Sequence, residues 1–295
     1  MLCRSWLRSK ATELFGIDLR SLALFRMGLA LIVLGDLIFV RFPDLRAFYT
    51  DEGVLPRTLL LSQLARSRFS LFLLNGSVAF TLFLFFFIGL AGLCLLIGWR
   101  TRLSTFICWL LTVSLQVRNQ IILSGGDEIT RMLLFWSIFL PLGSLYSIDQ
   151  RLRPSLRQLP PHHFSIATIA LLLQVFLVYE IGVVFKIMTR EWMNGTATYY
   201  ALSTGYGTTA FGNFLLRFPS FLRIVTHLVL GYELIAPLLL FVPIRTGSTR
   251  LFIIFSFLVL QFTFGSSLIL QVFPWVMCIA MFAFVPSQFW QKIGR

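Results

Sequence analysis

A lysine and a glutamate at the end of one long apolar segment are the residues of this sequence best suited to acid–base chemistry. Glu180 and Lys186 follow Tyr179 in that segment. A charged group at membrane depth costs roughly 2.5–3.5 kcal/mol on insertion scales, so an ionisable residue there is a functional candidate. On a helix Tyr179, Gly182 and Lys186 share one face, whereas Glu180 lies on another, so the two charges are not expected to pair within the helix. The glycine leaves room beside the lysine for a second helix or a flat ligand.

The same residues also fit a purely structural role. A lysine at the end of a span can extend its amine to the membrane interface, and Trp192 is typical of the aromatic belt at that level. Both interpretations remain open at the level of this segment.

The composition is that of a membrane protein. Of 295 residues, 57% are apolar and 13% charged, and the mean hydropathy is +0.84. The stretch Leu251–Gln291 contains 41 residues without a single charge. At about 1.5 Å per helical residue it reaches roughly 60 Å, which is two crossings of a bilayer core of about 30 Å.

We therefore predict an all-α fold, a polytopic helical membrane bundle of about eight transmembrane helices in a single domain over residues 1–295. The first six spans are expected at Leu22–Val40, Ser77–Ile97, Leu103–Ile122, Met132–Leu145, Phe164–Ile187 and Leu222–Phe241. The uncharged run supplies the last two, broken near Phe264–Ser267. One span fewer with a re-entrant hairpin is the alternative.

The distribution of basic residues predicts the orientation of the chain. With a cytoplasmic N-terminus, the inner segments hold 13 Lys and Arg and the outer loops hold 8, so both termini are expected in the cytoplasm. Membrane insertion thereby explains the net charge of +13, and no nucleic-acid partner is expected. The cysteines are far apart, and the pair His162-His163 stands alone in a basic loop, so we predict no metal site.

Several ionisable residues within the spans need partners. Arg26 and Asp36 do not stack on one face of a helix, so each is expected to pair with another helix. Glu233 lies in mid-span, one turn before Pro237, where an unpaired carboxylate would be costly. Its candidate partners are Lys186, Arg26 and Arg223.

Three polar segments are predicted to meet on the outer face. They are the charged loop 41–70, the loop Ser124–Glu128 with Asp127, and the exit from Lys186 to Trp192. Polar groups that converge at one depth are more typical of a binding site than of independent loops.

Four stretches, taken in order along the chain, resemble a known family. They are Arg26 with Asp44–Pro56; Arg118-Asn119 with Gly125–Asp127, Leu140–Gly143 and Tyr146–Asp149; Gly182 and Lys186 with Trp192–Gly195; and Glu233 and Pro237 with Phe273–Met277. Together they resemble the HTTM family, the membrane-domain relatives of vitamin K-dependent γ-carboxylase.

The resemblance implies a catalytic role for Lys186. In the carboxylases the lysine that Lys186 matches is the base that deprotonates vitamin K hydroquinone, so the implied cofactor is a quinol such as reduced vitamin K. An amine in an apolar pocket loses the solvation of its charged form and can be neutral enough to act as a base. The candidate substrate-binding residues are Tyr179, Gly182, Trp192, Asp127, Glu233 and Arg26.

The chain also departs from the carboxylases. Those enzymes carry a large lumenal domain after the membrane part, whereas this sequence ends at Arg295. Their loop before the fourth span contains a histidine where this sequence has Gly125-Gly126-Asp127. We therefore expect this chain to share the membrane fold of the carboxylases more closely than their reaction, the carboxylation of glutamate.

Three classes of function remain. The first is a membrane enzyme that acts on a quinol-like or lipid substrate with Lys186 as base. The second is a non-catalytic membrane component that binds a quinone or a partner membrane or secreted protein, with Lys186 and Glu233 as a cross-helix pair. The third is a transporter, since ionisable residues in spans also line transport pathways.

The predicted orientation can be tested by thiol labelling. A cysteine placed in loop 41–70 is expected to react with a membrane-impermeant reagent from outside. One placed at 151–157 should react only after the membrane is permeabilised, which also serves as the control for reactivity. The opposite labelling pattern would overturn both the orientation and the outer-face site.

Overall fold

A computed structural model describes residues 10–63, 69–153, 155, 160–204, 207–242 and 246–293. In these ranges the regular secondary structure is almost entirely helical, as predicted. Among the described residues, five helices are long and apolar enough to cross a membrane, namely Leu19–Arg41, Val78–Ile97, Ile166–Ile187, Pro219–Leu239 and Gly247–Ser267. The chain is thus an integral membrane protein by the length and composition of its helices.

The chain divides into two compact units, and two of the four boundaries between them fall inside helices, after Ser21 and after Ile279. Unit 1 is residues 1–21, 162–270 and 280–295, and unit 2 is residues 22–161 and 271–279. That the whole chain acts as a single domain stays a prediction.

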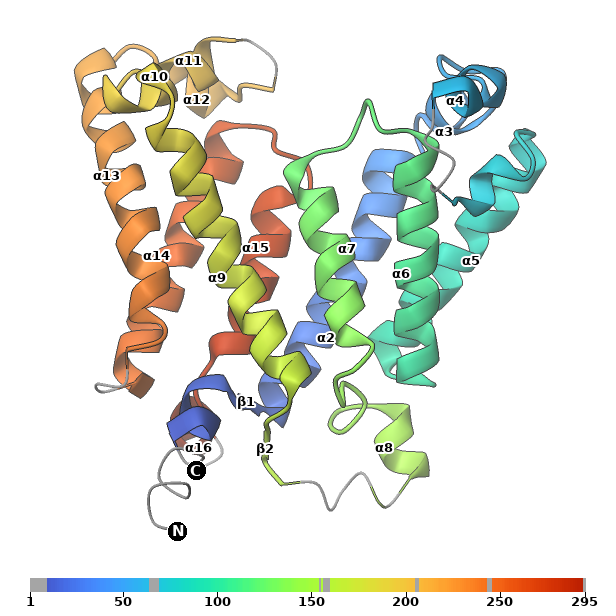
Figure 1. Cartoon of the computed structure of the whole chain (residues 1–295), viewed down its shortest axis with the longest axis horizontal. Helices are drawn as coiled ribbons and strands as arrows, with labels where there is room; N and C mark the ends of the chain where they lie inside the picture. Colours follow the sequence, from blue (N-terminus) through green and yellow to red (C-terminus); the bar gives the residue numbers. More distant parts are fainter. Residues whose placement is uncertain are drawn as a thin grey trace. The chain divides into compact units, whose positions relative to one another are not determined.

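Unit 1 is built on three long helices that run side by side (Figure 1). They are α9 (Ile166–Ile187), α13 (Pro219–Leu239) and α14 (Thr246–Ser267). Three short helices gather at one end of them: α10 (Arg190–Met193), α11 (Ala197–Ser203) and α12 (Ala210–Leu215). The antiparallel pair β1 (Ile17–Asp18) and β2 (His162–His163), the 3-10 turn η4 (Phe282–Phe284) and α16 (Ser287–Ile293) complete the unit.

Hydrogen bonds join segments near the two ends of the chain in unit 1. The Ser21 hydroxyl donates to the Val285 carbonyl at 3.1 Å and accepts from the Trp290 indole at 2.8 Å. Beside them, burial alone would raise the pKa of Asp18, but hydrogen bonds from Arg20 outweigh it and hold that pKa below its ordinary value. Residues 17–21 and 285–290 therefore lie next to each other. The cytoplasmic location of both ends of the chain stays a prediction.

Unit 2 contains most of α2 (Leu19–Gly35) and most of α15 (Phe273–Met281). Between them in sequence come the π-helical turn η1 (Asp36–Arg41), α3 (Leu45–Tyr49), α4 (Arg57–Gln63), the 3-10 turn η2 (Leu71–Leu73), α5 (Val78–Ile97), α6 (Thr101–Arg118), α7 (Gly125–Ser137) and α8 (Ile148–Leu152). Helices α5, α6 and α7 pack in sequence order.

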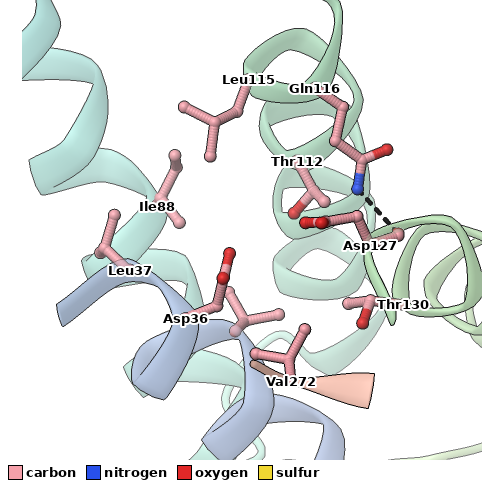
Figure 2. A pocket seen from close by; sticks show the side chains of 10 residues that line it. Asp36, Leu37, Ile88, Thr112, Leu115, Gln116, Asp127, Thr130 and Val272 are labelled. Atoms are coloured by element: carbon pink, nitrogen blue, oxygen red, sulfur yellow. Dashed lines mark hydrogen bonds between the residues drawn. The ribbon is translucent and has the colours of Figure 1, made fainter. Parts of the chain in front are cut away.

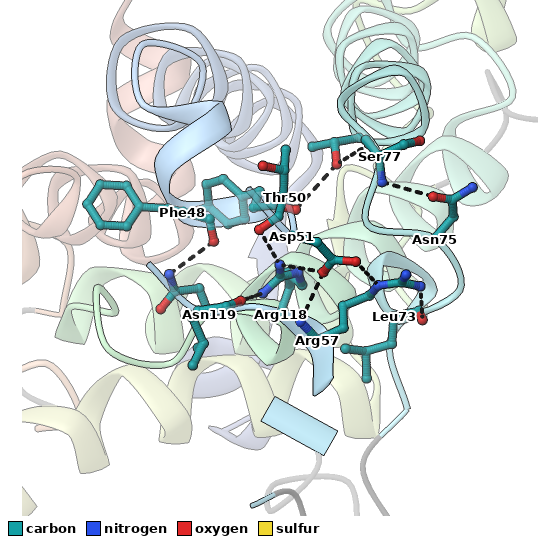
Figure 3. Close-up of polar contacts among 12 residues, drawn as sticks. Phe48, Thr50, Asp51, Arg57, Leu73, Asn75, Ser77, Arg118 and Asn119 are labelled. Carbon is teal, nitrogen blue, oxygen red and sulfur yellow. Dashed lines mark hydrogen bonds and ion pairs between the residues drawn. The ribbon is translucent and has the colours of Figure 1, made fainter. Parts of the chain in front are cut away.

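Arg118, at the end of α6, forms hydrogen bonds with the segment between η1 and α5. Its buried guanidinium donates to the carbonyls of Leu55 and Thr50, both at 2.8 Å (Figure 3). Asp51 lies 3.7 Å from it and also pairs with Arg57. Burial opposes ionisation of Asp51, but the hydrogen bonds from Arg57 prevail and lower its pKa. Loop carbonyls that would otherwise be buried without donors are thereby satisfied.

The turn from α5 to α6 depends on a glycine. Gly98 has a φ of +71°, and a Cβ there would lie 1.6 Å from Nη1 of Arg26. The Asp149 carboxylate caps α6 by accepting from the backbone N–H groups of Arg100 and Thr101 at 2.9 and 2.7 Å. Despite burial, these hydrogen bonds lower the pKa of Asp149. Only a residue without a side chain leaves the space that the buried arginine occupies.

The structure corrects two details of the predicted spans. Ser124–Glu128 is not a loop: α7 begins at Gly125, because Ser124 and Asp127 form a capping box. The third predicted span corresponds to α6, of 18 residues, and the fourth overlaps α7, of 13 residues. Neither helix is among those long and apolar enough for a full crossing. The break near Phe264–Ser267 is confirmed by the end of α14 at Ser267, and Phe273–Phe284 is a shorter apolar helix. The count of about eight spans stays a prediction.

Parts of the two loops chosen for labelling lie outside the described residues. These parts are residues 64–68 of loop 41–70, with Arg66 and Arg68, and residues 154, 156 and 157 of segment 151–157.

Removal of the Arg118 guanidinium should strongly destabilise unit 2. Arg118→Met leaves the carbonyls of Thr50 and Leu55 without donors, which predicts a loss of about 2–5 kcal/mol in the free energy of unfolding. The thermal midpoint of the purified protein should fall accordingly, while Arg151→Met, at an exposed position of α8, should leave it nearly unchanged. Equal midpoints for Arg118→Met and the wild type would contradict this role of Arg118.

Candidate functional site

Lys186 and Glu233 form an ion pair between two adjacent helices of unit 1. Lys186 lies in the last turn of α9, and its Nζ contacts Oε2 of Glu233 in α13. The lysine side chain is 23% exposed and that of the glutamate 6%. Glu233 was expected to be paired, and of its three candidate partners the structure selects Lys186. Each group supplies the opposite charge that the other needs in apolar surroundings.

The indole of Trp192 covers the lysine amine. Nζ of Lys186 lies 4.7 Å from the centre of the Trp192 ring, within the range of a cation–π interaction. After α9, the N–H and the hydroxyl of Thr189 donate to the Lys186 carbonyl at 3.1 and 2.8 Å, and the short helix that carries the ring begins at Arg190. Trp192 therefore contacts the ion pair and does not serve only as an interfacial anchor.

The segment after Trp192 contacts α13 through polar side chains. Arg223 donates from Nε to the Asn194 carbonyl at 3.1 Å, and the His227 ring lies 3.3 Å from the Met193 carbonyl. Gly195 has a φ of +76°, and a Cβ there would lie 2.4 Å from the His227 ring and 2.6 Å from Arg223. A glycine is thus required at 195 for the exit segment to close over α13. Arg223, a predicted partner of Glu233, is engaged in this contact instead.

Tyr179 and Gly182 have different surroundings although they share a face of α9. Tyr179 is buried, with its ring 4.6 Å from that of Phe257 and its hydroxyl accepting from Gln261 at 3.3 Å. It therefore holds α9 against α14. A Cβ at Gly182 would meet no atom within 4 Å. The predicted free space one turn before Lys186 is present.

Among the described residues of unit 1, three acceptor oxygens are buried without a hydrogen-bond partner. They are Oε1 of Gln174, Oε1 of Glu180 and Oε1 of Gln261. Gln174 and Glu180 lie on α9, and Gln261 adjoins Tyr179. A buried acceptor without a donor is costly, and a hydroxyl group or a water molecule would satisfy each of them.

Unit 2 contains a second buried cluster of charges. Arg41, which is 2% exposed, donates from Nε to Asp36 at 3.0 Å and from Nη1 to the Tyr49 hydroxyl at 3.0 Å, and it also pairs with Asp127. The expectation that Asp36 pairs with another helix was wrong, because the π-helical turn brings residues i and i+5 together within one segment. Burial raises the pKa of Tyr49 to about 12, so its hydroxyl stays protonated.

A small cavity adjoins this cluster. Its volume is about 20 Å³, and its polar lining includes Asp36, Asp127 and Gln116, whose amide donates to the Asp127 carbonyl at 2.7 Å (Figure 2). Such a volume holds about one water molecule. The Asp127 carboxylate also accepts from Ser124, so it is committed to the helix cap and to Arg41. A ring-sized ligand does not fit in this cavity, and a substrate contact of Asp127 stays a prediction.

Arg26 is fully buried in unit 2. Its Nη2 donates to the Tyr146 carbonyl at 2.8 Å, whereas Nε and Nη1 have no partner among the described residues. The arginine therefore ties α2 to the loop before α8.

The predicted site residues thus belong to two separate groups. Lys186, Glu233, Trp192, Tyr179 and Gly182 lie in unit 1, and the structure brings the first three together. Asp127 and Arg26 lie in unit 2. The convergence of all three polar segments on one face stays a prediction. Sequence reasoning missed Arg41 as the centre of a cluster, since it was counted with the loop that follows the first span.

Comparison with known proteins identifies relatives of the chain. The model of the HTTM domain matches residues 16–290. The uncharacterized protein YitO of Bacillus subtilis is 31% identical over 134 residues, which are 44% of this chain and 43% of YitO. The sporulation-delaying protein SdpB of the same organism is 28% identical over 149 residues, 47% of this chain and 44% of SdpB. The chain therefore matches less than half the length of either relative, and no solved structure matches it.

Proposed function

Because this chain belongs to the HTTM family, we propose that it is a membrane enzyme that binds a flat, tailed molecule of quinol or lipid type beside Lys186, which takes a proton from it. The observation that carries this proposal is the Lys186–Glu233 pair, covered by Trp192 and still partly exposed. A pair with a purely structural role could be fully enclosed, whereas this amine retains access to its surroundings.

The free space at Gly182 supports a flat ligand. It lies one turn before the lysine on the same helix face. The unpartnered Oε1 of Glu180 lies on a different face of the same helix and is not counted with this space. A hydroquinone offers hydroxyl groups on a planar ring, one of which is the proton source that the amine needs.

Glu233 can accept the proton of the Lys186 ammonium group, which leaves the lysine as a neutral amine. Transfer of the ammonium proton to the Glu233 carboxylate produces a neutral amine beside a neutral acid, which avoids a charge in apolar surroundings. The amine then accepts a proton from the ligand hydroxyl, and the products are an ammonium group and a quinolate. The Trp192 ring stabilises that ammonium by its cation–π interaction. Lys186 is the catalytic base in this scheme, and Glu233 holds the exchanged proton.

A non-catalytic role is the second candidate, and the ion pair itself favours it. A cross-helix pair between α9 and α13 stabilises the bundle and can present the exit segment to a partner membrane or secreted protein. The two candidates differ in whether an arginine can replace the lysine. Arginine keeps the ion pair but supplies no neutral amine.

Reduced vitamin K is the probe for the proposed chemistry. The purified protein in nanodiscs should bind reduced vitamin K and form its quinolate. Quinolate formation is monitored by the absorbance of the quinolate. Lys186→Arg should retain binding but lower the rate of quinolate formation by about 100-fold or more, as for loss of a general base. Lys186→Met should lose the same activity, and Lys292→Arg, at an exposed site, is the matched control. Quinolate formation that survives in Lys186→Met, or wild-type protein that does not bind the quinol, would reject the proposal.

A further inference from the structure

We propose that a groove in unit 2 binds the headgroup of a zwitterionic phospholipid that carries a primary ammonium, of the phosphatidylethanolamine class. This site is independent of the Lys186–Glu233 pair and of the proposed enzyme activity. It rests on a groove, two charges without partners and an apolar stripe that extends from them along one helix.

The groove lies where two spans reach the membrane surface. Its volume is about 360 Å³, and it is lined by residues 42–47, which follow η1, together with Val78 and Leu82 in the first turns of α5. The span Leu19–Arg41 ends directly before it, and the span Val78–Ile97 begins in it. The groove is therefore at the level of lipid headgroups.

Two side chains of opposite charge border the groove. Asp44 and Arg46 are both exposed and both line it. In the part of the chain that the structure describes, neither side chain has a hydrogen-bond or ion-pair partner, and Asp44 does not cap α3. A guanidinium binds phosphate in a bidentate manner, and a carboxylate accepts hydrogen bonds from an ammonium group. The pair thus complements both charges of a zwitterionic headgroup.

An apolar stripe on α5 continues from the groove. Leu82, Phe86, Leu90, Leu93 and Ile97 recur at helical spacing on one face of α5, and they are 42–65% exposed. From Leu82 to Ile97 the stripe is about 22 Å long at the helical rise, which exceeds the roughly 15 Å of one leaflet. Phe39, 79% exposed, lies on η1, which contacts α5. A lipid whose headgroup is in the groove can therefore lay its acyl chains along this surface.

The two charges also predict which headgroup is preferred. An anionic lipid would pair with Arg46 but be repelled by Asp44. A quaternary ammonium has no N–H donor for the carboxylate, whereas a primary ammonium has three. Phosphatidylethanolamine satisfies both side chains.

Native mass spectrometry of the purified chain tests this site. Phosphatidylethanolamine and phosphatidylglycerol with identical acyl chains are added together, and the ratio of bound lipids is measured. The wild type should retain more phosphatidylethanolamine. Asp44→Asn should reduce this preference by about two- to fivefold, the range for a partly exposed ion pair. Arg46→Gln should reduce binding of both lipids. Glu52→Gln and Arg151→Gln, at exposed positions away from the groove, should leave the ratio unchanged.

A third variant tests the groove without changing its charge. Ala47→Trp fills part of the groove and should reduce the binding of both lipids. The proposal is overturned if the wild type prefers phosphatidylglycerol, if Asp44→Asn leaves the ratio unchanged, or if Ala47→Trp binds lipid as the wild type does. Equal retention of phosphatidylcholine would exclude the hydrogen bonds to the ammonium.

Discussion

A charge within the apolar part of a membrane protein must find its partner inside the protein, because lipid supplies none. In unit 1 the lysine at the end of α9 meets the glutamate in the middle of α13, and this contact joins two long helices whose surfaces are otherwise mostly apolar. The Trp192 ring lies over the amine of that pair, and contacts of Arg223 and His227 hold the segment after the ring on α13. The candidate chemistry and the packing of unit 1 therefore have the same physical origin.

The two units use buried charge differently. In unit 2 Arg41 is enclosed by two aspartates and a tyrosine, and the adjoining cavity has room for about one water molecule. Such an enclosed cluster is suited to fixing the position of helices. In unit 1 the Lys186–Glu233 pair stays partly exposed, and open space lies at Gly182, one turn before the lysine. A charged pair that keeps access to its surroundings can meet a ligand, which is why the proposed activity is placed there.

The sequence predicts the helical membrane fold and the pairing of Glu233, because apolar runs and the cost of a buried carboxylate are local properties. It could not select Lys186 from three candidates, since the choice depends on which helices are neighbours. The Asp36–Arg41 pair escaped detection because its spacing fits a π-helical turn and not an α-helix. Gly125 and Gly126 suggested a loop, although Ser124 and Asp127 carry the spacing of a capping box that starts a helix. Helices α6 and α7 bury polar residues such as Gln116 and Thr130, and neither is among the helices long and apolar enough to cross a membrane.

The coupling between Lys186 and Glu233 is the most direct test of the central claim. The free energy of unfolding is measured in mixed detergent micelles for Lys186→Met, Glu233→Gln, the double variant and the wild type. An ion pair that is partly exposed predicts a coupling energy of about 1–3 kcal/mol, so that the double variant loses much less than the sum of the single losses. Single losses that add to within about 0.5 kcal/mol would show that the two side chains do not interact, and would contradict the account.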